Sequence, residues 1–147
     1  MRTAPVATSK GLTLSTARML WLVFLGLQGI FIAIAHTILK PNAHAAPAPA
    51  IVYAIVGLAV VEIAFFATFR SNLLARARAK AESGEAAQAQ ATWTLAQILG
   101  IVSAEAIVLF GFVLHMFGAQ PVWISTALLA LGVLNMLAYF PQQSGNR

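Results

Sequence analysis

Four apolar stretches follow one another along the chain, each near the length that a helix needs to cross a lipid bilayer. They cover residues 19–39, 51–70, 93–118 and 122–140. A bilayer core is about 30 Å thick and a helix rises about 1.5 Å per residue, so about 20 apolar residues span it. The pattern predicts an all-α fold, a four-helix bundle that forms one transmembrane domain over residues 1–147.

Polar and helix-breaking residues mark where the predicted helices end. Lys40-Pro41 ends the first, and an Ala/Pro-rich loop follows it. The polar stretch 71–92 is rich in good helix formers and is broken at Ser83-Gly84. It predicts a helical hairpin that projects about two turns beyond the bilayer. Residues 118–121 predict a tight connection, and Pro141 ends the fourth helix.

The first stretch has a rival interpretation as a signal peptide cleaved at Ala43-His44-Ala45. Its apolar run is longer than the roughly 7–15 residues of such a segment. We therefore expect an uncleaved first helix.

The basic residues predict the orientation of the helices. One side of the predicted bundle carries eight of the nine Lys and Arg residues, and Lys40 alone lies on the other. The eight are Arg2, Lys10, Arg18, Arg70, Arg76, Arg78, Lys80 and Arg147. Because Lys and Arg concentrate in cytoplasmic segments, the helices should run up-down-up-down with both termini and the hairpin in the cytoplasm. The predicted location is the bacterial inner (cytoplasmic) membrane, with a multi-pass chain.

Composition supports a membrane protein and excludes several kinds of chemistry. Hydrophobic residues make up 60% of the chain and charged residues 9%, too few to cover a water-facing surface. The absence of cysteine excludes disulfides, thiolate nucleophiles and iron–sulfur clusters. Without a catalytic triad pattern or a phosphate-binding loop, we expect no enzyme. The net charge of +5 lacks a basic face with interleaved aromatics, so we expect no nucleic-acid partner.

Each predicted span carries one hydrogen-bonding side chain at a similar depth: Gln28, Glu62, Glu105 and Asn135. All four fall roughly 16–20 Å from the outer ends of their helices, at about 1.5 Å per residue. A charge at that depth costs about 2.5–3.5 kcal/mol, so these groups should turn inward and seek one another. One interpretation is a polar layer that holds the helices together. The other is a proton or cation site formed by Glu62 and Glu105.

A resemblance accompanies the second interpretation. The segment AEAIVLFGFVL around Glu105 resembles the carboxylate helix of rotary ATPase proteolipid (c-type) subunits, in which a mid-membrane Glu carries the proton or sodium ion. The chain departs from that family in lacking a glycine-repeat helix and in carrying its acids on the second and third spans. As a whole it resembles uncharacterised small four-span membrane proteins of bacteria, which implies a fold and no activity.

Two histidines form a second candidate site. His36 and His115 each lie three residues from the outer ends of parallel spans, where two imidazoles could hold haem b; we expect no other cofactor and no metal. The basic residues Arg70, Arg76, Arg78 and Lys80 should meet anionic lipid headgroups or a partner subunit.

These observations favour a small non-catalytic accessory or scaffold subunit of a membrane assembly, with the polar layer holding its helices together. The alternative is a proton- or cation-translocating protein that uses Glu62 and Glu105. A second alternative is a haem b-binding membrane anchor that uses His36 and His115. The expected partners are the lipid bilayer and other membrane subunits or a second copy of the chain.

Overall fold

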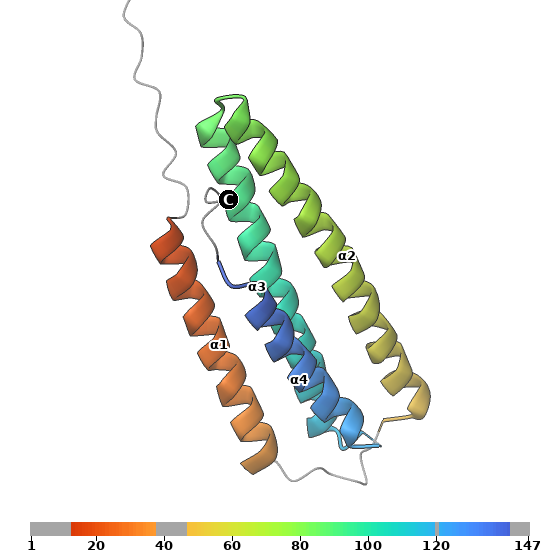
Figure 1. Ribbon diagram of the computed structural model, residues 1–147. Coiled ribbons are helices and arrows are strands. Elements are labelled where there is room, and N and C mark those ends of the chain that lie inside the picture. The colour runs from red at the N-terminus through yellow and green to blue at the C-terminus, as the bar shows by residue number, and fades with distance from the viewer. Residues whose placement is uncertain (1–12, 38–46, 120, 142–147) are drawn as a thin grey trace, which may run out of the picture.

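The computed structural model describes residues 13–37, 47–119 and 121–141. Within these ranges the chain forms four helices and no strand: α1 (Leu14–Thr37), α2 (Pro49–Glu82), α3 (Ala86–Met116) and α4 (Trp123–Ala138). The predicted all-α fold is confirmed. Successive helices run in alternating directions (Figure 1). The signal-peptide cleavage site and the basic residues Arg2, Lys10, Lys40 and Arg147 lie outside the described residues.

Three of the four helices are long and apolar enough to cross a membrane, namely α1, α2 and α3. The fourth helix is shorter, with 16 residues. At about 1.5 Å per residue it is about 24 Å long, less than a bilayer core of about 30 Å. Its last turn closes where the backbone N–H of Tyr139 donates to the carbonyls of Asn135 and Met136, at 3.2 Å each. The predicted fourth span, 122–140, therefore contains a helix that is shorter than the predicted span.

Helices α2 and α3 form one long hairpin that extends past the end of α4 (Figure 1). Helix α2 runs without a break for 34 residues to Glu82, and α3 begins at Ala86. The turn between them uses Gly84 at a φ of +84°, a conformation that glycine adopts without steric cost. Below, the end with this turn is called the hairpin end, and the opposite end, where His36 and His115 lie, the histidine end.

The first helix begins earlier than the apolar pattern predicts, at Leu14 instead of residue 19. Its start is capped by Thr13, whose hydroxyl accepts a hydrogen bond from the backbone N–H of Thr16 at 3.2 Å. A threonine in this position satisfies an amide at the start of the helix that would otherwise have no partner. The cap therefore adds more than a turn of helix to the apolar segment.

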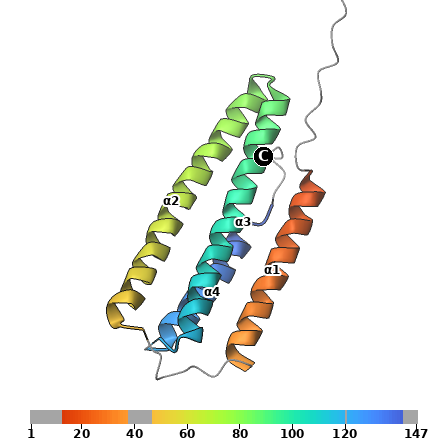
Figure 2. The same cartoon turned by 180° about the vertical axis from the view of Figure 1, so that it is seen from behind.

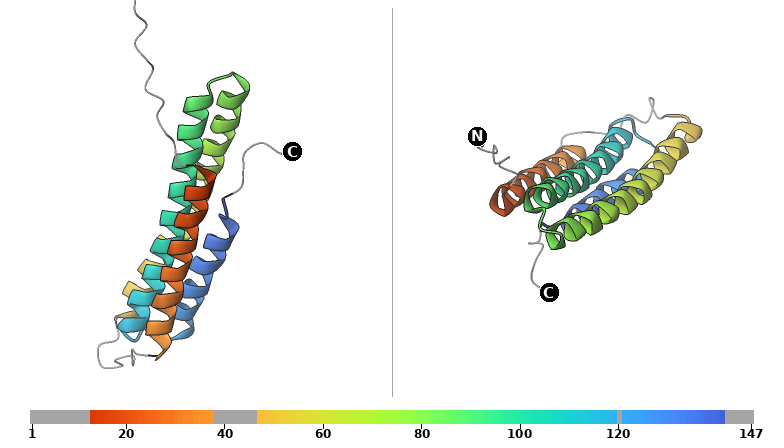
Figure 3. Two further views of the ribbon diagram at one scale, coloured as in Figure 1. Left: turned by 90° about the vertical axis from the view of Figure 1, so that its left-hand side faces the viewer. Right: turned by 90° about the horizontal axis from the view of Figure 1, so that it is seen from above.

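Helix α3 is the centre of the bundle. It contacts each of the other three helices, and it buries far more residues than α1 or α2 does. Seen from behind, α3 lies between α1 and α2 (Figure 2), and α4 packs against one of its faces (Figure 3). The remaining side of α3 faces outward and is apolar, with Leu95, Ile98, Val102, Leu109, Val113 and Met116 exposed.

Different sides of α3 pack on α1 and α2. Toward α2, Ile107 and Leu114 pack with Val52 and Ala59, together with Ile124 and Leu128 of α4. Toward α1, Ile101 packs with Trp21 and Met136, and Val108 with Ala35 and Leu129. The Trp21 Nε1–H also donates to the Met136 carbonyl at 2.8 Å. This division of α3 into two sides decides which polar groups can meet.

Helices α3 and α4 approach closely because two glycines lie in their interface. A Cβ on Gly132 would collide with the Val108 side chain and lie 2.9 Å from the Val108 backbone nitrogen. A Cβ on Gly111 would lie 2.8 Å from the backbone nitrogen of Leu129. By contrast, a Cβ on Gly29 of α1 would meet nothing within 4 Å. The close contact in this bundle is therefore made by the α3–α4 pair.

We expect Gly132→Ala to destabilise the protein by about 1–3 kcal/mol, because the added methyl overpacks a backbone contact. Gly29→Ala is the matched control, since it adds the same methyl in open space and has the better helix propensity. Thermal unfolding of both purified variants in the same detergent measures the difference. Equal melting temperatures would show that α3 and α4 do not depend on this contact.

Candidate functional site

Helix α3 carries most of the buried polar side chains in the described chain. Gln97, Ser103, Glu105 and His115 belong to it, while Gln28 comes from α1 and Ser125 from α4. Several of their polar atoms have no hydrogen-bond partner among the described residues. Buried polar groups of this kind are rare in folded proteins, and each calls for a physical account.

Gln28 and Glu105 form a pair between α1 and α3. The Gln28 side chain is 0% exposed and that of Glu105 is 9% exposed. Glu105 lies on the side of α3 that carries Ile101, Val108 and Phe112, the residues that pack toward α1. The Gln28 amide lies close to the Glu105 carboxyl. However, no polar atom of either side chain makes a hydrogen bond with full geometry, so we describe the pair as a close polar contact.

Ser103 and Asn135 lie on the other side of α3. Ser103 precedes Ile107 and Phe110 by one and two turns, and these residues pack toward α2. Asn135 follows Leu128 by two turns of α4, and Leu128 also packs toward α2. The Ser103 hydroxyl and the Asn135 Nδ2 are both buried without a partner. These two groups therefore belong to the seam between α2, α3 and α4.

Glu62 lies on α2 at the margin of its packed face. It is partly exposed, and it makes no hydrogen bond or ion pair with any described residue. Its neighbours one turn away on the helix, Leu58 and Phe65, are exposed apolar side chains. In the antiparallel pairing of α2 and α3, Ala59 packs with Ile107, so Glu62 lies one turn further along, near the level of Ser103.

Helix α3 therefore separates the two carboxylates that the sequence suggested as one site. Glu105 lies on the side of α3 that packs on α1. Glu62 lies on α2, which packs on a different side of α3. The four polar residues lie at a similar level of the bundle, but they do not form one network. The reason is that Ser103 and Glu105, two residues apart on a helix, point to nearly opposite sides. In this arrangement Glu62 and Glu105 are not placed to share a proton.

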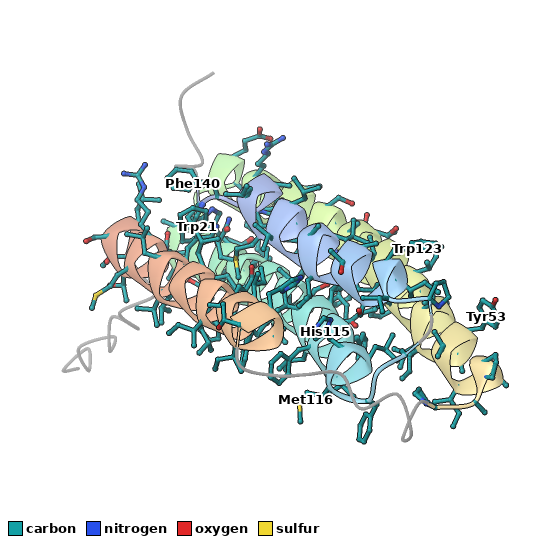
Figure 4. All side chains as sticks on the ribbon, turned by 90° about the horizontal axis from the view of Figure 1, so that it is seen from below. Trp21, Tyr53, His115, Met116, Trp123 and Phe140 are labelled. Atoms are coloured by element: carbon teal, nitrogen blue, oxygen red, sulfur yellow. The ribbon has the colours of Figure 1, made fainter. Side chains whose placement is uncertain are left out.

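His36 and His115 are brought together at the histidine end, with ring centroids 5.1 Å apart and the rings stacked at 26°. The Nδ1 of His36 contacts the Ile32 carbonyl at 3.0 Å, and a carbonyl can only accept, so this nitrogen carries the proton. The Nδ1 of His115 is 3.3 Å from the Ser125 hydroxyl. That hydroxyl donates to the Val122 carbonyl and therefore accepts from His115. Figure 4 shows His115 inside the bundle near this end.

This arrangement does not fit the haem site suggested by the sequence. Imidazoles on opposite faces of a haem iron point their nitrogens at each other across the macrocycle, with ring centres about 6 Å apart at metal–nitrogen bonds of about 2 Å. Here the rings stack face to face at 5.1 Å, which differs from the arrangement of two opposed haem ligands. The pair serves instead as a contact between the ends of α1 and α3.

Sequence reasoning missed a group of arginines and aromatic rings at the end of α4. The guanidinium of Arg70 lies 4.4 Å from the Tyr139 ring centre, and that of Arg18 lies 5.5 Å from the Phe140 ring centre. Trp21 meets Phe140 edge to face at 5.0 Å, and Figure 4 shows these two rings side by side. Two adjacent aromatics before Pro141 were the available signal, but their partners come from two other helices.

The four basic residues assigned to lipid or a partner therefore differ in position. Arg70 is partly buried against Tyr139, whereas Arg76 and Arg78 are exposed. Lys80 donates to the Gln88 side-chain oxygen across the hairpin at 3.0 Å. Of the four residues, only Arg76 and Arg78 are exposed, as the sequence predicts for residues that contact lipid headgroups or a partner.

No protein family, curated protein or solved structure matches this chain.

A double-mutant cycle measures the Gln28–Glu105 contact. We expect Gln28→Leu and Glu105→Leu each to destabilise the fold by about 1–3 kcal/mol, because each leaves one buried polar group without a neighbour. The double variant should be less destabilised than the sum, by a coupling of about 0.5–3 kcal/mol. Glu105→Gln keeps size and a hydrogen-bonding end, so it should unfold close to wild type. Additive losses in the double variant would contradict a contact between the two side chains.

Proposed function

We propose that this protein is a non-catalytic accessory or scaffold subunit in the bacterial inner membrane. Its surface supports a membrane location, because large apolar side chains are exposed on the outward faces of three helices, among them Leu22, Val61 and Val102. A contiguous apolar surface of this extent is unfavourable in water and favourable in lipid. The three long apolar helices agree with this location.

The proposed orientation places the hairpin end in the cytoplasm. All Lys and Arg residues of the described chain lie toward that end: Arg18, Arg70, Arg76, Arg78 and Lys80. The positive-inside rule assigns such an end to the cytoplasmic side. In this arrangement α4 is a fourth, short span, and the chain crosses the membrane up-down-up-down with both termini inside.

The observation that carries the accessory role is the position of Glu62. Its carboxyl lies within the apolar part of α2, is partly exposed, and has no partner among the described residues. A carboxyl that faces lipid is costly, by about 2.5–3.5 kcal/mol if charged. A hydrogen-bonding side chain on the helix of another membrane subunit would remove that cost. We therefore propose that this face of α2 docks on a partner's transmembrane helix.

The side chains around Glu62 suit a helix interface. Phe65 and Phe69 stack on each other with centroids 5.8 Å apart and an interplanar angle of 6°. Both rings are exposed in this chain. A flat aromatic pair beside one polar group gives a partner helix both contact area and a fixed register.

Crosslinking in native membranes tests this docking. We expect a photo-crosslinking phenylalanine analogue at Phe65 to capture a discrete protein adduct that persists in Glu62→Gln and is lost in Glu62→Leu. The same analogue at Leu22 is the control, because Leu22 is equally exposed, on α1. The same adduct at both positions would contradict the proposal. So would an adduct at Phe65 that is equally strong in Glu62→Gln and Glu62→Leu. A band at twice the chain mass would show that the partner is a second copy.

A second candidate function is proton or cation translocation with Glu105 as the carrier. It is favoured by one observation: both carboxyl oxygens of Glu105 and both polar atoms of Gln28 are buried without completed hydrogen bonds. A carboxyl in that state can exchange a proton without breaking a formed bond. In proteoliposomes, Glu105→Gln would abolish flux in a transporter and would leave assembly intact in an accessory subunit.

Cysteine labelling tests the orientation, since the chain has no cysteine of its own. In intact cells without an outer membrane, we expect Ala48→Cys to react with a membrane-impermeant maleimide. Ser83→Cys should react only after the cells are opened, because it lies in the turn at the hairpin end. The reverse pattern would place the hairpin outside.

A further inference from the structure

The arginine and aromatic group at the end of α4 has guanidinium N–H donors that could bind a ligand. Arg70 from α2 and Arg18 from α1 lie on the rings of Tyr139 and Phe140, the two residues that follow α4. An aromatic ring occupies one face of each guanidinium. The N–H groups of a guanidinium point outward in its plane, so ring stacking leaves them available to a ligand.

Neither arginine has an acidic partner in the described chain. All four acidic residues are described, and no ion pair links any of them to Arg18 or Arg70. Glu62 and Glu105 lie deeper in the bundle, while Glu82 and Glu85 lie at the tip of the hairpin. Arg18 is exposed, but Arg70 is partly buried, and a partly buried cation without a counter-charge is unfavourable unless an anion from outside the chain compensates it.

The position of Arg70 is built into the packing. A Cβ on Gly100 of α3 would lie 3.1 Å from the Arg70 Nε and 3.1 Å from the Tyr139 ring, so glycine provides the space for both. The Arg70 Nε is buried without a partner. The two terminal nitrogens of Arg70 make no hydrogen bond with the described chain either, and they are not enclosed. The structure therefore holds the guanidinium in place with its outer edge open.

The position of Arg70 along α2 brings this edge near the level of lipid phosphates. Helix α2 begins at Pro49, so Arg70 lies about 32 Å further along at about 1.5 Å per residue, close to the thickness of a bilayer core of about 30 Å. Helices α2 and α3 continue beyond the end of α4 (Figure 1). Guanidinium groups at this depth match the planar, doubly accepting geometry of phosphate oxygens.

We infer that the end of α4, between Arg70 and Arg18, binds the phosphate of an anionic phospholipid, with Arg70 as the principal ligand. The site rests on the membrane location proposed above and is independent of docking at Glu62. It differs from general attraction to a basic surface, because Arg76 and Arg78 on the same helix are exposed and lack a packed ring beneath them.

Native mass spectrometry of the full-length protein tests this inference. The probes are phosphatidylglycerol, phosphatidylcholine as the lipid with no net charge, and inorganic phosphate. We expect phosphatidylglycerol adducts that survive detergent exchange in wild type and in Arg76→Gln, and a loss of these adducts in Arg70→Gln. The two variants change net charge equally, so the comparison removes the effect of overall charge.

Three outcomes would overturn the inference. The first is equal loss in Arg76→Gln and Arg70→Gln, which indicates unspecific attraction. The second is equal retention of phosphatidylcholine, and the third is displacement of the lipid by inorganic phosphate at the same concentration, which indicates a site for the free ion. If Arg70→Gln does not fold, Arg70→Lys replaces it. Lysine keeps the charge but loses the flat, doubly donating edge, so it should retain fewer adducts than Arg76→Gln, and equal retention would also contradict the inference.

Discussion

The backbone contact between α3 and α4 determines how most of the other groups in this protein are placed. Gly132 allows α4 to rest on Val108, and Gly111 allows α3 to rest on Leu129. This register brings Ser125 to His115, and it brings Tyr139 to the space beside Gly100. A side chain larger than hydrogen at either glycine would move α4 outward, and the groups along it would lose their partners together.

Helix α3 also divides the polar groups of the bundle into two sets with different physical roles. Gln28 and Glu105 are enclosed between α1 and α3 and lie close to each other. Glu62 is at the margin of α2 with exposed apolar neighbours. The enclosed Glu105 carboxyl has the Gln28 amide of the same chain close to it, without a completed hydrogen bond, whereas Glu62 has no polar partner among the described residues. This distinction is the reason to connect Glu62 with a partner and Glu105 with internal structure or proton exchange.

The shortness of α4 determines which side chains meet toward the hairpin end. Helix α4 ends while its neighbours continue, so Tyr139 and Phe140 lie between α1 and α2. There the guanidinium of Arg70 packs on the Tyr139 ring and that of Arg18 on the Phe140 ring. The apolar core and the cationic surface thus meet at one level.

The sequence by itself determined the helical class, the approximate position of each helix and the common level of Gln28, Glu62, Glu105 and Asn135. Those properties follow from local information: apolar run length, helix breakers and a fixed rise per residue. Only the tertiary structure decided that α3 lies between Glu62 and Glu105, that His36 stacks on His115, and that Arg70 packs on Tyr139. Counting along a helix gives depth, but the direction in which a side chain points matters only relative to neighbours. Helices that are apolar on most sides carry almost no signal for which neighbour each face meets, so packing between glycines and large side chains made that choice.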